Sequence, residues 1–204
     1  PGGGRPGAPR LAAVCGSGTI AVEAARMALD LAPGLKRTCG FQKLAWYDGP
    51  TWQRIKQAAQ RRAKPAAPAM IWASDSDATA IHQCSENSAA AGVQAALVVE
   101  RADALTRPPP APAGIIVSNP PYGLRVGDSG ALAAFYPQFG DALKQRYAGW
   151  TAYLFSGDTR LPKLIGLKAS RRTPLFNVAL ECRPYEYRLL SGSMRSPVPA
   201  EGAP

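Results

Sequence analysis

Short apolar segments alternate with helical patterns along most of this chain, and this alternation limits the fold more than any other feature. Each segment is four or five residues long, and most are followed by a turn that contains glycine, proline or acidic residues. The expected strands are residues 11–14, 70–73, 96–99, 114–117 and 151–155. The expected helices are residues 20–31, 52–64, 78–91 and 131–146. Alternating strands and helices predict an α/β fold with a doubly wound, mostly parallel sheet.

The end regions of the chain differ from this central pattern. Residues 167–190 predict a last pair of strands that turns near residues 174–178. Residues 1–10 and 191–204 contain mainly glycine, proline and other residues that bury little surface, so we expect both ends to be disordered. The predicted folded domain is therefore residues 11–190, and 204 residues suit one domain better than two.

Cysteine and histidine usage gives no sign of a metal site. The four cysteines are scattered at positions 15, 39, 84 and 182, and His82 is the only histidine. No Cys-x-x-Cys pair is present, so we expect no structural zinc site. Scattered cysteines, no signal-peptide pattern and no apolar run near ~20 residues predict a cytoplasmic protein without a membrane span.

The net charge of +10 favours a polyanionic partner, with nucleic acid as the first choice. The expected helix at residues 52–64 is basic, and two interpretations stay open: contact with phosphates, or a solvated helix face. Aromatic residues flank this helix, and they would either stack on bases or cover the edge of a core. These residues are Trp46, Tyr47 and Trp52, and the basic ones are Arg54, Lys56, Arg61, Arg62 and Lys64.

A glycine turn, Cys15-Gly16-Ser17-Gly18-Thr19, lies between the first strand and the first helix. Glycines allow a tight turn and a close approach of the backbone to a ligand, and a helix N-terminus offers free N–H groups. No Gly-Lys-Ser/Thr follows, so this is not a phosphate-binding Walker loop. A plain tight turn remains an equal alternative for the motif by itself.

Acidic residues follow the second and third strands, where a doubly wound sheet binds its ligands. Asp75 could accept hydrogen bonds from both hydroxyls of a ribose, whereas Asp77 is expected to cap the next helix; the alternative is that both residues are helix caps. Asp103 could accept a hydrogen bond from an adenine amino group, or it could be a solvated loop residue.

The most specific motif is Ser118-Asn119-Pro120-Pro121-Tyr122, directly after the fourth strand. Two prolines make the turn rigid. The Asn119 side-chain oxygen and the Pro120 carbonyl can both accept hydrogen bonds from one exocyclic amine, while Tyr122 stacks on the base. Positioning and polarisation of the amine would then promote its attack on an electrophile, without a strong base.

The order of these motifs resembles the class I S-adenosylmethionine (SAM)-dependent methyltransferases that act on amino groups. More narrowly, the chain resembles the THUMP-associated ribosomal RNA guanine-N2 methyltransferases that act on large-subunit rRNA. Beyond the motifs above, the resemblance lies in Glu23, in the region before and within the basic helix, and in two C-terminal pieces. These segments are Ala32-Pro33-Gly34-Leu35, Gly40-Phe41, Trp52, Gly166-Leu167-Lys168 and Leu175-Phe176-Asn177.

The resemblance implies a seven-stranded sheet with an antiparallel last strand, SAM as cofactor and rRNA as partner. Cys15, Gly16, Gly18 and Thr19 would form the turn that approaches the amino-acid part of SAM. Asp75 would hold its ribose and Asp103 its adenine. Asn119, Pro120, Pro121 and Tyr122 would form the catalytic turn around a guanine flipped out of its helix.

Two departures from the family pattern affect what we expect of this chain. The family usually has Asp-Pro before the glycine turn, where this chain has Ala12-Ala13. The missing acid helps to bind the methionine end of SAM, so we expect weak SAM binding or none. The upstream methyltransferase segment and the THUMP RNA-binding module are absent, and we expect a truncated or frame-shifted product of a longer parent.

Three functional hypotheses follow, in order of preference. The first is a SAM-dependent guanine-N2 methyltransferase of 23S rRNA. The second is an adenine-N6 DNA methyltransferase or a protein glutamine-N5 methyltransferase, which share the Asn-Pro-Pro-aromatic motif. The third is an inactive methyltransferase-fold fragment that binds RNA, which the Ala12-Ala13 departure favours.

Overall fold

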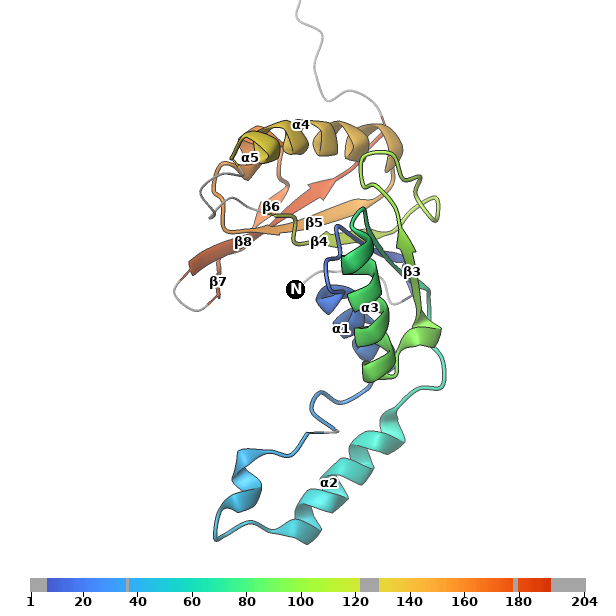
Figure 1. The fold of residues 1–204 in the computed structure, drawn as a ribbon, viewed down its shortest axis with the longest axis vertical. Coiled ribbons are helices and arrows are strands. Elements are labelled where there is room, and N and C mark those ends of the chain that lie inside the picture. The colour runs from blue at the N-terminus through green and yellow to red at the C-terminus, as the bar shows by residue number, and fades with distance from the viewer. Residues whose placement is uncertain (1–6, 36, 122–128, 178–179, 192–204) are drawn as a thin grey trace, which may run out of the picture.

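The computed structural model describes residues 7–35, 37–121, 129–177 and 180–191 (Figure 1). The strands are β1 (Arg10–Ala13), β2 (Ile71–Asp75), β3 (Leu97–Arg101), β4 (Ile115–Ser118), β5 (Thr151–Ser156), β6 (Arg171–Arg172), β7 (Leu175–Asn177) and β8 (Leu180–Arg188). The α-helices are α1 (Thr19–Ala28), α2 (Gly49–Arg62), α3 (Ala78–Ala91), α4 (Ser129–Arg146) and α5 (Leu161–Leu164). Two short 3-10 helices are η1 (Gly40–Lys43) and η2 (Gln94–Ala96).

The sheet has the order β3-β2-β1-β4-β5-β8-β6, with the short β7 paired to β8. Strands β1 to β5 pair in parallel, whereas β8 is antiparallel to β5. This arrangement confirms the predicted doubly wound sheet with an antiparallel last strand: seven strands lie along the main path, and β7 is an additional short strand. The strand order reverses between β1 and β4, so a ligand crevice is expected at the carboxyl ends of these two strands.

Helices cover the two faces of the sheet in separate places. Helices α1 and α3 lie over β1, β2 and β3, while α4 and α5 lie on the opposite face over β4, β5 and β8 (Figure 1). Alternating residues of β1 therefore enter different clusters: Ala12 packs with Ala21 and Val22 of α1, and Leu11 packs with residues of the α4 side. Burial of these alternating apolar residues holds the layers together.

Helix α2 begins earlier than the sequence predicts. We expected Thr51 as its N-cap, but the N-cap is Asp48, whose carboxylate accepts a hydrogen bond from the Thr51 backbone N–H at 3.0 Å. Pro50 lies within the first turn, where it loses no helical hydrogen bond. Helix α1 also ends before residue 31, because the chain turns at Asp30, which has a φ of 52°.

Other sequence predictions match closely. Helix α3 spans residues 78–91 as predicted, with Asp77 as its N-cap and Gly92 as its left-handed C-cap. Within the described ranges, no helix is long and apolar enough to cross a membrane. Most of the two ends that we expect to be disordered lies outside the described residues.

Candidate active site

The glycine turn connects β1 to α1 and is held by hydrogen bonds to β2 and α3. The Cys15 N–H donates to the Ser74 carbonyl at 3.0 Å, and the Asn87 side chain donates to the Ser17 carbonyl at 2.9 Å. Gly16 and Gly18 have positive φ angles of 55° and 85°, which only glycine adopts readily. The local sequence therefore forms a tight turn whose shape is held by the neighbouring strand and helix.

Cys84 of α3 lies directly against Gly18. A Cβ atom on Gly18 would come within 2.3 Å of the Cys84 sulfur, so the turn and the helix touch without any intervening side chain. Burial and the nearby Cys84 and Asp75 side chains raise the pKa of the Cys15 thiol to about 12. The Cys15 thiol is therefore held in its neutral form at neutral pH.

Asp75 ends β2 beside this turn, and its side chain organises the backbone around it. One carboxylate oxygen accepts the Gly16 N–H at 2.9 Å, and the other accepts the Asp77 N–H at 3.1 Å. Asp75 is only 9% exposed, yet it lines a cavity. A carboxylate accepts up to about four hydrogen bonds, so Asp75 keeps acceptor capacity for a ligand hydroxyl.

Asp103 lies across the same cavity, after β3. One of its carboxylate oxygens accepts the Leu105 N–H at 2.9 Å, which forms a local turn and leaves the exposed side chain free to accept more. The cavity has a volume of about 340 Å³, and its walls come from the ends of β1, β2, β3 and β4 and from α4. They are formed by Val14, Asp75, Ser76, Ala102, Asp103, Ala104, Pro121 and Phe135.

The turn after β4 brings the proline motif to this cavity. Ser118 is buried, and its hydroxyl donates to the Ala13 carbonyl at the end of β1. Asn119 is exposed, Pro120 is buried and Pro121 lines the cavity, so the motif faces the crevice on one side. Tyr122 lies outside the described residues.

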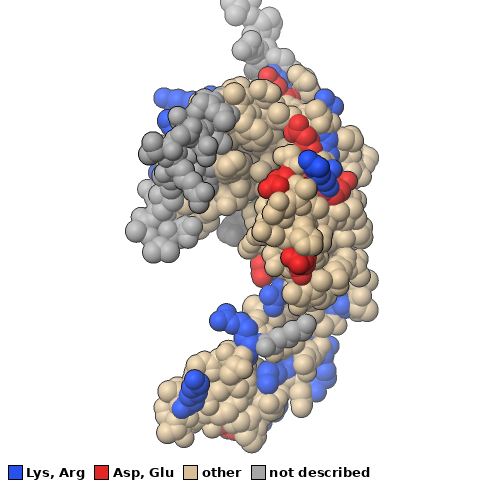
Figure 2. All heavy atoms as spheres, in the orientation of Figure 1, with Lys and Arg blue, Asp and Glu red and all other residues tan. Residues whose placement is uncertain are grey.

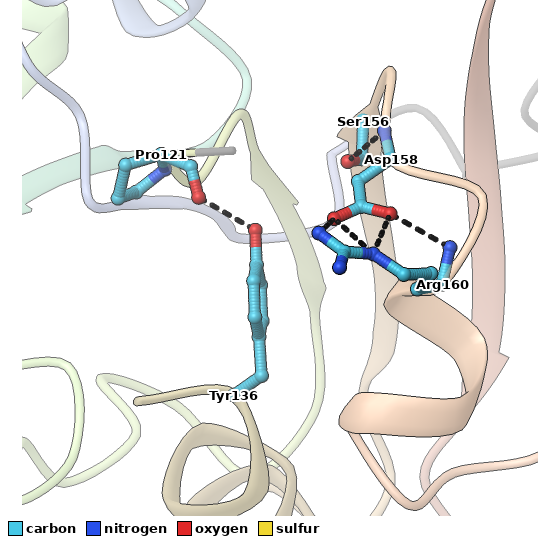
Figure 3. A network of polar contacts seen from close by, with 5 residues as sticks. All are labelled: Pro121, Tyr136, Ser156, Asp158 and Arg160. Carbon is cyan, nitrogen blue, oxygen red and sulfur yellow. Dashed lines mark hydrogen bonds and ion pairs between the residues drawn. The ribbon is translucent and has the colours of Figure 1, made fainter. Parts of the chain in front are cut away.

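Tyr136 of α4 fixes the far end of this turn. Its hydroxyl donates to the Pro121 carbonyl at 2.6 Å, and its ring is 1% exposed within the core (Figure 3). The Pro121 carbonyl is therefore already engaged by Tyr136, whereas Asn119, two residues earlier in the turn, is exposed. The roles of Tyr136 and Phe135 were not predicted, because in the sequence both residues occupy ordinary apolar positions of a helix.

A charged pair, Asp158 and Arg160, follows the end of β5, the strand that pairs with β4 (Figure 3). The Asp158 carboxylate accepts hydrogen bonds from the Arg160 backbone and guanidinium, the shortest of them at 2.8 Å. These hydrogen bonds lower the pKa of Asp158. Sequence reasoning did not single out this pair, although its position after a parallel strand was a usable signal.

Ala12 and Ala13 occupy the last two positions of β1, and both are 3% exposed. Val14, rather than either alanine, forms the part of the cavity wall that precedes the glycine turn. Only Asp75 and Asp103 bring carboxylates to the described lining of the cavity. Weak SAM binding stays a prediction, because the affinity depends on all the residues around the cavity.

The structure thus brings together Asp75, Asp103 and Pro121, with Gly16 hydrogen-bonded to Asp75 behind them. It leaves the predicted basic helix α2 far from them, because the segment that holds α2 joins the end of α1 to the start of β2 (Figure 1). No group of three or more potential metal ligands occurs in the described part of the chain.

Comparisons with known proteins agree with this arrangement. Ribosomal RNA large subunit methyltransferase K/L of Shewanella baltica is 38% identical over 189 residues, which cover 91% of this chain and 27% of that protein. A Synechocystis sp. protein, provisionally named an RNA methyltransferase, is 38% identical over 189 residues and is covered to 49%. The chain therefore spans about half or less of the length of these relatives.

A solved structure matches over nearly the whole chain. The crystal structure of SMU.472, provisionally assigned as a methyltransferase and complexed with SAH, superposes with a TM-score of 0.83 at 25% identity. The match covers 92% of this chain and 50% of that one. The UPF0020 family model, described as RMKL-like, methyltransferase domain, matches residues 3–186. This chain belongs to that family of methyltransferase domains.

Proposed function

We propose that this domain transfers a methyl group from SAM to the exocyclic N2 amine of a guanine in large-subunit rRNA. The observation that carries the proposal is the cavity at the carboxyl ends of the strands, where Asp75 and Asp103 lie together with Pro121 of the Asn-Pro-Pro turn. A cofactor cradle and a substrate-amine clamp are therefore adjacent, as direct transfer of a methyl group requires.

The residues around the cavity suit SAM. Cys15, Gly16, Gly18 and Thr19 form the turn that would approach its amino-acid part, with the backbone pinned by Asp75. The remaining acceptor capacity of Asp75 would bind the ribose hydroxyls, and Asp103 would accept the adenine amine. SAM supplies a methyl group on a positively charged sulfur, which leaves as a neutral thioether.

The substrate side needs positioning rather than a strong base. The Asn119 side chain and the Pro120 carbonyl would accept hydrogen bonds from the two N–H groups of the guanine amine. They would direct its lone pair toward the cofactor. The nitrogen releases a proton only after it has become positively charged, when its pKa is low. Tyr122 would stack on the ring, and the Tyr136 hydrogen bond keeps the turn in place.

The RNA substrate is supported by charge and by the relatives. The net charge of +10 favours a polyanion over a protein glutamine, and both curated relatives are named for RNA. We place the reaction in the cytoplasm, because all four cysteines are free thiols, which suits a reducing compartment.

The test is methyl transfer from labelled SAM to unmodified large-subunit rRNA, followed by nucleoside analysis. At a SAM concentration high enough to offset weak binding, we expect N2-methylguanosine with this chain. We expect a loss of at least about 100-fold with Asn119→Ala, because the amine then loses an acceptor in the transition state. Label in adenosine instead of guanosine would contradict the guanine assignment.

Calorimetric titration with SAM addresses the Ala12-Ala13 departure separately. This chain could bind rRNA while it binds SAM weakly or not at all. That result would support the third hypothesis, an inactive fragment that binds RNA. A micromolar dissociation constant would contradict the expectation of weak SAM binding. A THUMP module in a longer parent protein remains part of the proposal, since the chain spans about half or less of its relatives.

A further inference from the structure

Residues 37–64 form an arm that projects away from the sheet, with η1 and α2 as its two pieces of helix (Figure 1). Neither helix contains a buried residue. The base of the arm is fastened to α1 by the Lys64 N–H, which donates to the Leu29 carbonyl, and by an exposed ion pair between Arg62 and Asp30. The arm therefore adds little to the core, and its surface is free for another use.

Three aromatic residues hold the arm together from within. The Phe41 ring packs edge-on against Trp52 with centroids 5.0 Å apart, and it lies 6.1 Å from Tyr47. The Gln42 side chain accepts the Cys39 N–H at 2.7 Å and donates to the Tyr47 hydroxyl. These contacts explain why Phe41, Tyr47 and Trp52 are present, so these three need no ligand.

Trp46 is different, because 78% of it is exposed in the segment between η1 and α2. Among the aromatic contacts of the described residues, none involves Trp46, although its neighbours Phe41 and Tyr47 pack together. Exposure of an indole ring to water is energetically unfavourable, and its flat face is available for stacking. The fold of the arm leaves this ring unexplained.

The arm is also strongly basic. Residues 37–64 contain seven of the 24 lysines and arginines of the chain, but only one of its 14 acidic residues. Figure 2 shows Lys and Arg side chains along the arm, whereas the acidic side chains on this face gather mainly on the body above it. Arg54 and Arg61 are exposed, seven residues apart and thus on one side of α2. In the described structure, neither guanidinium pairs with a carboxylate.

We infer that the arm is a second RNA-binding surface, in which Arg54 and Arg61 contact phosphates and Trp46 stacks on an unpaired base. This inference rests on the proposed RNA substrate. The arm leaves the sheet between the end of α1 and the start of β2, which is the amino edge, whereas the cavity lies at the carboxyl edge. The arm would hold a part of the RNA remote from the methylated base.

Charge and polarity favour RNA over other anionic partners. A membrane-binding helix presents a broad apolar face, but the outward side of α2 carries mainly Gln57, Ala58 and arginines, with Ile55 as its one large apolar residue. An acidic protein would pair with the arginines but would leave the Trp46 ring without a stacking partner. RNA supplies both regularly spaced phosphates and flat bases.

The test uses a fluorescein-labelled RNA hairpin with an unpaired loop, and anisotropy measured without SAM over a range of salt concentrations. For Arg54→Gln/Arg61→Gln we expect about tenfold weaker binding and a salt slope smaller by about two, one for each lost phosphate contact. For Trp46→Ala we expect roughly 5- to 100-fold weaker binding to the hairpin but little change for a fully paired duplex, while Trp46→Phe restores most of it.

Lys144→Gln/Arg146→Gln is the matched control, because it removes the same charge from the exposed end of α4. Equal weakening by the control pair would overturn the arm as a specific surface. Undiminished RNA binding by the arm variants would also overturn it. The same holds if the unaltered chain binds polyglutamate or anionic phosphatidylserine vesicles as tightly as it binds the RNA hairpin.

Methyl transfer separates this inference from the proposed function. With long rRNA, the arm variants should raise KM about tenfold with kcat unchanged, and they should not alter the calorimetric affinity for SAM. If the chain binds RNA through the arm but transfers no methyl group, the proposed function fails and the arm stands. If transfer to rRNA proceeds equally well in the arm variants, the arm inference fails and the proposed function stands.

Discussion

The Tyr136 hydroxyl donates to the Pro121 carbonyl across 2.6 Å, which ties the turn after β4 to the buried side of α4. Phe135, the residue before Tyr136, lines the cavity and stacks on Phe139 with ring centroids 5.3 Å apart. Helix α4 thus controls both the wall of the cavity and the position of the Asn-Pro-Pro turn.

Tyr136→Phe should lower kcat by about tenfold while the affinity for SAM stays the same. The ring still fills the core, but the turn loses a hydrogen bond worth about 1 kcal/mol and its acceptors shift slightly. Steady-state methylation of rRNA and SAM titration measure the two quantities. Tyr147→Phe is the control, since its hydroxyl donates to the Arg107 carbonyl, away from the turn. An equal fall in kcat for both variants would show that the effect is only structural.

Asp75→Asn should weaken SAM binding by about tenfold or more. The amide can still accept the Gly16 N–H, but it loses the charge and one of the acceptor oxygens that would bind ribose. Asp77→Asn is the matched control, because asparagine caps a helix as well as aspartate does. Calorimetric titration of both variants should change the dissociation constant only for Asp75→Asn, and an unchanged value there would remove Asp75 from the cofactor site.

Gly18→Ala should destabilise the domain by about 2–4 kcal/mol. The new Cβ would lie 2.3 Å from the Cys84 sulfur, and alanine would be strained at a φ of 85°. Gly16→Ala has a positive φ but open space around it, so we expect only about 1–2 kcal/mol. Urea denaturation measures both free energies of unfolding. Cys84→Ala should recover part of the Gly18→Ala loss, and no recovery would mean that backbone strain alone is responsible.

The stability of the domain should fall at alkaline pH partly through Cys15. Its pKa is 9.0 ordinarily and about 12 in the folded protein, chiefly because the thiol is buried. As the pH rises past 9.0, the unfolded thiol ionises while the folded one stays protonated, so the unfolded state gains stability. The contribution is complete below pH 9.0 and is lost progressively toward pH 12.

Thermal melting of the unaltered chain and of Cys15→Ala over this pH range isolates that contribution. The Tm of the unaltered chain should fall more steeply than that of the variant, which has no thiol to ionise at this position. Parallel curves for the two proteins would contradict the raised pKa of Cys15.

The strands and helices of the core were predictable because their patterns are local. Residues 78–91 carry their own N-cap and C-cap, and helix α3 has these limits. The start of α2 was not predictable in the same way, since Asp48 and Thr51 are both good caps in sequence. In the structure Asp48 is the cap, and it lies in the segment where the Phe41 ring contacts both Tyr47 and Trp52.

The sequence by itself determined the doubly wound sheet, the glycine turn, and the positions of Asp75, Asp103 and the Asn-Pro-Pro motif after successive strands. Each of these is a matter of periodicity or of residues adjacent in the chain. Only the tertiary structure decided that Tyr136 holds Pro121, that Cys84 touches Gly18, and that the basic helix lies at the opposite edge from the cavity. Those relationships join residues distant in sequence, and they depend on how the layers pack, which no local pattern encodes.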